Sequence, residues 1–515
     1  MRNRIGRYAA SPAVPMDPHE RLFGCRPLLP DTLAPGGGHP FHDARHSVCL
    51  REREAEITAA FDAIEPALRE VAARQWQGGF AAAAESLLRE RLGVAVPACR
   101  LQSSWLAPLN MRNLYADCVV GTFLRLMERQ FDRNPAATEE GEPVDGLIRK
   151  WGFHAIDISP CADGRLSGVI DYILRVPPAV VASRKSFAGA LFDVEESVRH
   201  WMETELRRYR EQRPNAPQEP TRYLKIGVYH TSSADPEHEG CAAHGSDARR
   251  AAAALCERLE AFACAIENAY GQGISVATLL IGVDTDTDAI RLHVPDAEGV
   301  VYADRFVDNA VLFDEIAPLT RDAAKDAIRS AVARAAGTSV DDPQTEGMRW
   351  FCGYILKNNM AQIEYVRAHH NGRYADLGHT ERLMIVGDGL DDVQMRNLAY
   401  QAQMETIEEG AVDMDVGVGI FKRLNIESGL PIPVLVHFGY DGKVPGSRMR
   451  ALERCRRMVR AIDARYTQLA RDGWLYTYAM VRDRGGNKPP ELIEIDETAS
   501  ARKAGCGCAQ VESKA

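Results

Sequence analysis

The sequence predicts an α/β protein with a helical N-terminal domain, a larger domain of alternating strands and helices, and a weaker copy of that second plan. Three observations lead to this prediction. Between residues 52 and 135, apolar residues recur every three or four positions, the spacing of one helix face. From residue 138, short apolar runs alternate with long amphipathic stretches, as in a partly parallel sheet covered by helices. Residues 379–515 repeat that alternation more faintly.

Length and composition restrict the class of protein. The chain has 515 residues, too many for one hydrophobic core, and domains of roughly 100 to 200 residues predict about three. A net charge of −10 argues against binding to nucleic acid or to a membrane surface, because such proteins carry basic faces. No apolar run approaches the roughly 20 residues that span a bilayer, and the N-terminus lacks the apolar core of a signal peptide. We therefore expect a cytoplasmic protein.

The pattern divides the chain into four segments. Residues 1–48 contain prolines, three consecutive glycines and no sustained apolar period, so we expect a flexible arm. Residues 49–137 are assigned to the helical domain, in which Pro66 should kink the first helix. The main α/β domain is assigned to residues 138–378, and its weaker copy, with a frayed tail, to residues 379–515.

Short apolar runs locate the strands that matter for function. We expect strands at 153–158, 223–229 and 276–283, and a long helix from about residue 247. The buried face of that helix should carry four apolar residues at helical spacing, Leu255, Leu259, Phe262 and Ile266.

Two pairs of segments support the internal repeat. Residues 433–437 end in His437 and lead through a loop into a helix at 447–466, as residues 226–230 end in His230 before their own loop and helix. Residues 383–386 lead into Gly387-Asp388-Gly389, as residues 155–158 lead toward Cys161.

Twelve cysteines are scattered along the chain without a dense framework, so in a cytoplasmic protein metal binding becomes the question. A catalytic zinc ion uses three protein ligands from Cys, His, Asp or Glu and keeps one position open. Cys161 directly follows a predicted strand, His230 ends one, and Cys241 precedes a long helix whose free amides favour a thiolate. Loops beyond the ends of parallel strands converge, so these three side chains can meet.

Asp163 and Arg165 add chemistry to this predicted site. Two positions past Cys161, a carboxylate can accept a hydrogen bond from the reacting water and orient its oxygen. Arg165 can hold Asp163 through a bidentate ion pair and keep it ionised. A purely structural zinc site has no need of such a pair.

The stretch Cys161-Ala-Asp163-Gly-Arg165 reproduces the Cys-x-Asp-x-Arg motif of β-class carbonic anhydrases, and the strand ending in His230 resembles the segment that carries their histidine ligand. The three-part layout is similar to the shell-associated carbonic anhydrases of α-carboxysomes over nearly the whole chain. The resemblance implies a β-carbonic-anhydrase-like catalytic zinc domain at 138–378 and a degenerate copy of it at 379–515. It also implies one Zn²⁺ per chain bound by Cys161, His230 and Cys241, with Asp163 and Arg165 as catalytic residues.

The histidine ligand departs from the usual spacing. In the β class the second cysteine follows the histidine by three positions, which His238 satisfies relative to Cys241, whereas His230 lies eleven positions before it. We expect His230, because it ends an apolar strand while His238 lies in a polar loop. His238, and after it His244, remain alternatives.

By the same resemblance, the protein catalyses reversible hydration of CO2 to bicarbonate inside the carboxysome and supplies CO2 to Rubisco. Rubisco and shell proteins are the implied partners, with the basic N-terminal arm as the docking segment, and a homodimer or higher homo-oligomer is expected. His379 is a candidate for proton transfer. In the degenerate copy only His437 remains of the ligand set, so a single zinc is expected. The alternative is a non-catalytic, zinc-stabilised scaffold protein of the carboxysome.

Two other groups of polar residues could suggest metal sites. Four residues near the N-terminus have suitable spacing but lie in the predicted arm, where no fold would support ligand geometry: His39, His42, His46 and Cys49. The run Asp284-Thr-Asp286-Thr-Asp288 resembles the start of a calcium loop. It is not an EF-hand, because Ala289 stands where the turn needs glycine.

Overall fold

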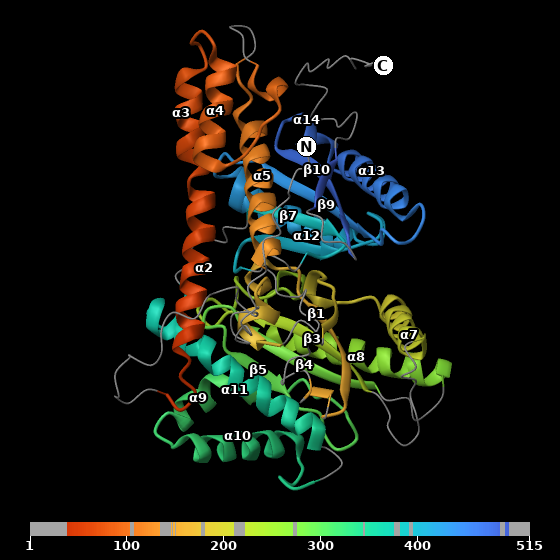
Figure 1. Ribbon diagram of the computed structural model, residues 1–515. Helices are drawn as coiled ribbons and strands as arrows, with labels where there is room; N and C mark the ends of the chain where they lie inside the picture. The colour runs from red at the N-terminus through yellow and green to blue at the C-terminus, as the bar shows by residue number, and fades with distance from the viewer. Residues whose placement is uncertain are drawn as a thin grey trace, which may run out of the picture.

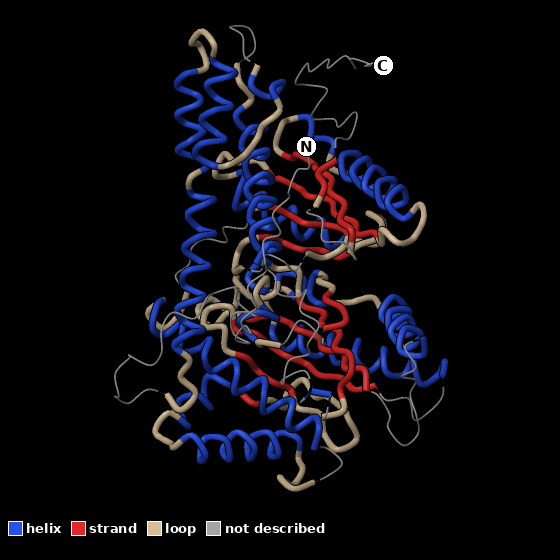
Figure 2. Tube along the Cα trace, in the orientation of Figure 1, coloured by secondary structure: helices blue, strands red, loops and turns tan. Residues whose placement is uncertain are grey.

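The computed structural model (Figure 1) describes residues 39–102, 108–133, 146, 148–149, 151–176, 181–210, 222–270, 276–342, 346–374, 382–390, 395–484 and 490–493. Two β-sheets, each with helices packed against it, lie one above the other, and N-terminal helices run along both (Figures 1 and 2). No helix within the described ranges is both long and apolar enough to cross a membrane.

The N-terminal helices begin earlier than the sequence pattern predicted. Helix α2 starts at Ala44, because the Asp43 carboxylate accepts a hydrogen bond from the His46 amide at 3.0 Å and caps it. Residues 44–48, expected in the arm, therefore belong to the helix. The kink expected at Pro66 is confirmed as a break at Ala63, which places Pro66 in the first turn of the next helix. The four long helices are α2 (Ala44–Asp62), α3 (Ile64–Arg74), α4 (Phe80–Leu92) and α5 (Met111–Arg133).

These helices are joined to both sheets. In the middle of α2, the buried Arg53 guanidinium lies 3.5 Å from the Asp171 carboxylate. On α5, Asp117 accepts a hydrogen bond at 2.7 Å from the hydroxyl of Tyr478 in the C-terminal sheet. The apolar residues of the helices pack in one continuous core with those of the first sheet. The helical segment thus connects the two halves of the molecule.

The first sheet has six strands in the order β2-β1-β3-β4-β5-β6. Strands β2, β1, β3 and β4 are parallel, and β5 and β6 continue the sheet antiparallel. Their bounds are β1 (Phe153–Pro160), β2 (Val181–Arg184), β3 (Arg222–Thr231), β4 (Val276–Asp284), β5 (Ile290–His293) and β6 (Val307–Asp308). The three strands predicted here correspond to β1, β3 and β4.

Helices on this half follow the expected pattern. Helix α8 (Ala248–Tyr270) packs on β3 and β4 and buries all four apolar residues predicted for its inner face. Helix α7 lies outside α8, and α11 packs against β5. The remaining helices of this half are α7 (Val194–Arg210), α9 (Asn309–Ile316), α10 (Arg321–Ala336) and α11 (Glu346–His369).

The second sheet repeats the first. Its order is β11-β10-β9-β7-β8, with β8, β7, β9 and β10 parallel and β11 antiparallel. This matches β5-β4-β3-β1-β2 strand for strand, so the predicted fold class, including the degenerate copy, is confirmed. Its elements are β7 (Leu383–Gly387), β8 (Ala399–Gln403), α12 (Ala411–Phe421), β9 (Ile432–Tyr440), α13 (Ser447–Arg465), α14 (Thr467–Arg471), β10 (Leu475–Asp483) and β11 (Glu491–Ile493).

Hydrogen-bond register shows how the copy differs from the original. In the copy, Gly387 pairs with His437. In the first sheet Pro160 pairs with Val228, so two residues further along both strands Ala162 would stand opposite His230. If the two histidines are aligned, Val386 rather than Gly387-Asp388-Gly389 stands in the place of Cys161. The copy has no cysteine at this position under either alignment.

Candidate metal centre

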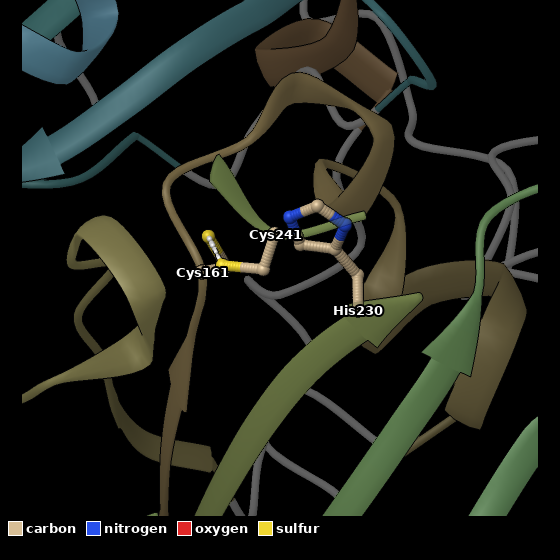
Figure 3. A group of neighbouring side chains, drawn as sticks. All are labelled: Cys161, His230 and Cys241. Atoms are coloured by element: carbon tan, nitrogen blue, oxygen red, sulfur yellow. Dashed lines mark hydrogen bonds between the residues drawn. The ribbon is translucent and has the colours of Figure 1, made fainter. Parts of the chain in front are cut away.

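Three segments that are distant in sequence bring Cys161, His230 and Cys241 together (Figure 3). Cys161 directly follows β1, where its amide donates to the carbonyl of Val228 in β3 at 2.9 Å. His230 lies near the end of β3, and Cys241 precedes the short turn Ala242–His244. The candidate ligand atoms of the three buried residues all lie within 4.8 Å of one another.

The spacing of the donor atoms fits a tetrahedral zinc ion. With Zn–S distances of about 2.3 Å and a tetrahedral angle, two sulfur ligands should lie about 3.8 Å apart. The Sγ atoms of Cys161 and Cys241 are 3.9 Å apart, and no bond joins them. The imidazole of His230 is turned toward this sulfur pair (Figure 3). Two thiolates and an imidazole are also a donor set that zinc prefers.

The pKa values of the two thiols are shifted in opposite directions. A hydrogen bond from the Cys161 thiol lowers the pKa of Cys241, with help from the amides of Ala243 and His244 in the following turn. The hydrogen bond to Cys241, together with burial, raises the pKa of Cys161 well above its usual value. The backbone contribution to the lower pKa of Cys241 comes from the one-turn segment rather than from the long helix α8, which starts at Ala248.

The structure separates His230 from the alternatives. His238 lies in the loop after β3 with its side chain 75% exposed, and its Nδ1 is 2.9 Å from an Asp235 carboxylate oxygen. His244 is buried, but its Nε2 is 3.0 Å from the carbonyl oxygen of Gly189. Of the three histidines, His230 is the one that shares a metal-binding group with the cysteines. His379 lies outside the described residues.

Asp163 and Arg165 form a rigid buried pair beside this group. The Arg165 guanidinium donates to both carboxylate oxygens of Asp163 at 2.9 Å, through Nε and Nη2. The Arg165 amide donates to the same carboxylate, also at 2.9 Å. Asp163 Oδ2 lies 3.5 Å from Nε2 of His230, so the carboxylate borders the space between the candidate ligands.

Arg165 is itself fixed by contacts that the sequence analysis missed. Its Nη1 donates to the carbonyl oxygen of Glu239 at 2.8 Å and to the hydroxyl of Thr285 at 3.1 Å. The Thr285 hydroxyl in turn donates to the carbonyl oxygen of Thr231, the neighbour of His230, at 3.0 Å. Thr285 directly follows β4, and β4 lies beside β3, which carries His230. The position of Thr285 after the neighbouring strand was the signal from which its place near the site could have been predicted.

The C-terminal sheet supports the same loop through its edge strand. The amide of Gln401 in β8 donates to the carbonyl of Ala162 at 3.0 Å, and the amide of Asn397 donates to the carbonyl of Gly164 at 2.9 Å. The Ser167 hydroxyl donates to the carbonyl of Ala399 at 3.1 Å. The degenerate copy therefore holds the backbone of the Cys161–Arg165 loop in place.

The other polar groups have structural partners. The N-terminal histidines are held by the fold, contrary to the expectation that no fold supports them: His46 bonds to Gln362 at 2.7 Å and His39 stacks on Phe313. In the run 284–288, Asp286 accepts hydrogen bonds from the hydroxyl of Ser232 and the amide of Ala234, which secures the loop after His230.

In the degenerate copy, Nδ1 of His437 lies 2.9 Å from the carbonyl oxygen of Asp388, and its buried Nε2 has no hydrogen-bond partner among the residues placed in the structure. Among the residues that the structure describes, Cys161, His230 and Cys241 make up the one group suited to bind a metal ion.

The fold and the site together define the class of protein. It is an α/β protein in which a buried Cys-His-Cys group, near the ends of parallel strands, forms a candidate catalytic metal centre. Comparison with known proteins specifies the family. Three family models match the chain: the N-terminal domain of carboxysome shell carbonic anhydrase at residues 39–131, its catalytic domain at 143–379 and its C-terminal domain at 380–497.

Whole-length relatives agree with these matches. The chain is 44% identical over 462 residues to a carboxysome shell carbonic anhydrase of Prochlorococcus marinus strain MIT 9313, covering 89% of each protein. It is 41% identical over 469 residues to that of Halothiobacillus neapolitanus, covering 90% of each, and 40% identical over 479 residues to that of Hydrogenovibrio crunogenus, covering 91% of this chain and 89% of the relative. The chain belongs to the carboxysome shell carbonic anhydrase family, which confirms the predicted enzyme class.

The turn that carries Cys241 gives a stability test. Gly189 has φ +66°, and a Cβ there would lie 2.7 Å from His244 Nε2 and 2.9 Å from Ala243 Cβ. Gly245 has a similar φ of +65°, but a Cβ there would contact nothing within 4 Å. Both alanine variants should lose about 1 kcal/mol of unfolding free energy to backbone strain. Gly189→Ala should lose a further ~1–3 kcal/mol by overpacking and should retain less metal.

Urea unfolding and metal analysis of the two variants measure this difference. Because Gly245→Ala carries the same backbone strain without the contacts, it is the matched control. Equal unfolding free energies and equal metal content in the two variants would show that the contact between residue 189 and the turn does not matter.

Proposed function

We propose that the protein is a zinc-dependent carbonic anhydrase that interconverts CO2 and bicarbonate, with Cys161, His230 and Cys241 as zinc ligands and Asp163 and Arg165 as catalytic residues. The observation that carries the proposal is that three donor atoms spaced to bind zinc lie beside a buried carboxylate, that of Asp163, which accepts two hydrogen bonds from the Arg165 guanidinium. A structural zinc site would need the first feature but not the second. Family membership supports the same activity.

Two sets of residues have different roles: the three ligands would bind the metal, and Asp163 would orient the reacting water. A zinc ion held by the two thiolates and the imidazole would acidify a water molecule and so supply the nucleophile that attacks CO2. Asp163 Oδ2 accepts from Arg165 Nη2, and because a carboxylate oxygen carries two lone pairs it can also accept one hydrogen of the reacting water. An ionised carboxylate can only accept, so it fixes that hydrogen and directs the oxygen lone pair toward CO2.

Arg165 keeps Asp163 in this role. Three donors of Arg165 bind the carboxylate, and further side-chain hydrogen bonds to Glu239 and Thr285 stop the guanidinium from rotating away. Since the pair is buried, the ionic hydrogen bonds are stronger than they would be in water.

The proposal also covers the cellular location of the protein, its partners and its domain boundaries. The relatives are named carboxysome shell carbonic anhydrases, which supports a place in the carboxysome. The proposal adds that the CO2 supplies Rubisco and that residues N-terminal to the first helix dock Rubisco or shell proteins. A homo-oligomer also remains a proposal. A catalytic domain at 138–378 and a C-terminal copy from 379 are supported by the ranges of the family models.

Substitution of the carboxylate tests the catalytic role. Asp163→Ala should lower kcat/KM for CO2 hydration by about 100-fold or more, because the reacting water loses its orienting acceptor. Stopped-flow assays of the full chain, with zinc content measured in the same samples, check this. Asp322→Ala, at a side chain that is 90% exposed on α10, is the matched control and should keep wild-type activity. Wild-type rates in zinc-loaded Asp163→Ala would contradict the catalytic role of Asp163, and absence of CO2 hydration by the zinc-loaded wild-type chain would favour the non-catalytic scaffold.

Metal analysis tests the ligand set. The full chain should contain one zinc ion, and the variants Cys241→Ser and His230→Ala should each lose most of it. Cys256→Ser and His238→Ala should retain it, because neither side chain belongs to the converging group. Two zinc ions per chain, or loss of zinc from His238→Ala but not from His230→Ala, would contradict the assignment.

Thr285 is expected to act as a positioning residue through Arg165. Thr285→Val keeps the side-chain shape but removes the hydroxyl that accepts from Arg165, so kcat should fall about tenfold with KM unchanged. Thr285→Ser restores the hydroxyl and should restore most of kcat. The assay is paired with thermal unfolding: a Thr285→Val enzyme with lower thermal stability but wild-type kcat would show that the hydroxyl is only structural.

A further inference from the structure

Asp413 is a largely buried carboxylate with no cationic partner in the described part of the chain. It lies in the first turn of α12, in the C-terminal half, and its Oδ1 accepts a hydrogen bond from the amide of Ala188 at 3.0 Å. By contrast, Asp415 lies two residues further along α12 at the surface and is paired with Arg465. Among the described residues, the negative charge of Asp413 is therefore balanced by one neutral amide alone.

The hydrogen bond to Ala188 does not account for the charge of Asp413. An asparagine could accept the same hydrogen bond without the cost of removing an ionised group from water. Burial raises the pKa of Asp413 to about 6. A carboxyl group with a pKa this close to neutral can take up a proton and release it again during turnover. A role in proton transfer accounts for a carboxylate at this position.

The same hydrogen bond places Asp413 close to the candidate metal centre. Ala188 follows Phe187, which pairs with Cys161 in an isolated parallel bridge. Because paired strands lie about 4.8 Å apart, the Asp413 carboxylate is within roughly 10 Å of the Cys161 backbone. A chain of hydrogen-bonded water molecules, with oxygen atoms about 2.8 Å apart, can span that distance in a few steps.

The segment that Asp413 contacts also adjoins the turn of the second cysteine. The carbonyl oxygen of Gly189 lies 3.0 Å from Nε2 of His244, in the turn that follows Cys241. Residues 188–190 pack against this turn, against β1 and β3, and against α12. Helix α12 therefore approaches the elements that carry all three candidate ligands across a single short segment of backbone.

Hydration of CO2 releases one proton for each bicarbonate ion that forms. We propose that the Asp413 carboxylate receives this proton, an inference that rests on the proposed carbonic anhydrase activity. The proton passes from the reacting water along hydrogen-bonded water molecules and converts the carboxylate to a carboxylic acid. Because the side chain is partly exposed, a buffer base in the solvent then removes the proton and restores the carboxylate.

Asp163 is less suited to this step, although it borders the candidate ligands. Both of its carboxylate oxygens accept from the Arg165 guanidinium, and a bound cation opposes protonation of a carboxylate. Asp413 has the opposite environment, since burial disfavours its charged form. The two carboxylates thus have separate roles, orientation of the reacting water and removal of its proton. The degenerate copy supplies the second.

The effect of buffer on turnover tests this role. In dilute HEPES, Asp413→Asn should lower kcat for CO2 hydration about tenfold or more, because the proton has lost its acceptor. The value of kcat/KM should stay at that of the wild type, since it covers only the steps up to bicarbonate formation. Concentrated HEPES should restore kcat by accepting the proton directly. Stopped-flow assays of the full chain measure both constants.

Asp415→Asn is the matched control, because it makes the same change on the same helix at an exposed carboxylate. It should keep the wild-type kcat at both buffer concentrations. An unchanged kcat for Asp413→Asn in dilute buffer would overturn the inference. A parallel fall of kcat and kcat/KM that buffer does not reverse would also overturn it, because Asp413 would then only position Ala188.

Two further variants separate this inference from its alternatives. Loss of kcat in His379→Ala, with Asp413→Asn unaffected, would assign proton transfer to His379 and overturn the role of Asp413. None of these outcomes decides the proposed function, because Asp163→Ala tests that function through kcat/KM.

Discussion

The guanidinium of Arg165 joins the segments that carry the candidate metal ligands. It binds Asp163 in the loop after β1, the carbonyl of Glu239 two residues before Cys241, and Thr285 at the end of β4. Through Thr285 it is also connected to the backbone beside His230. One planar cation with several donors can connect such segments, because its hydrogen bonds have fixed directions. The spacing of the two sulfurs and the imidazole depends on this connection.

The two sheets contribute unequally to the site although their topology is the same. The half that contains the first sheet supplies every side chain of the candidate centre, whereas the other half supplies backbone hydrogen bonds to the Ala162–Gly164 segment, from Gln401 in β8 and from Asn397 just before it. Loss of the ligand cysteine in the copy has therefore left a support rather than a second site. Helices α2 and α5 tie the halves together through Arg53 and Asp117, which resists separation of the support from the loop.

Some secondary-structure elements could be predicted from the sequence and others could not. Strands β1, β3 and β4 were predicted because their apolar runs are short and uninterrupted, and the inner face of α8 because its four residues keep helical spacing. The start of α2 was missed, since its cap at Asp43 lies in a segment rich in proline and glycine. The antiparallel strands β5 and β6 are only four and two residues long, too short for a periodic signal.

By itself, the sequence determined the candidate ligand types, the Asp163–Arg165 pair and the repeated plan, because residue identity and strand periodicity are local properties. It favoured His230 but left His238 open, since both precede Cys241 by eleven residues or fewer, and only the fold buries His230 and leaves His238 exposed. Nor could it reveal Thr285 or the hydrogen bonds from β8, because these contacts arise from strand adjacency and from the packing of two distant halves. Only the tertiary structure decided them, since hydrogen bonds between segments more than 100 residues apart leave no periodic trace in the sequence.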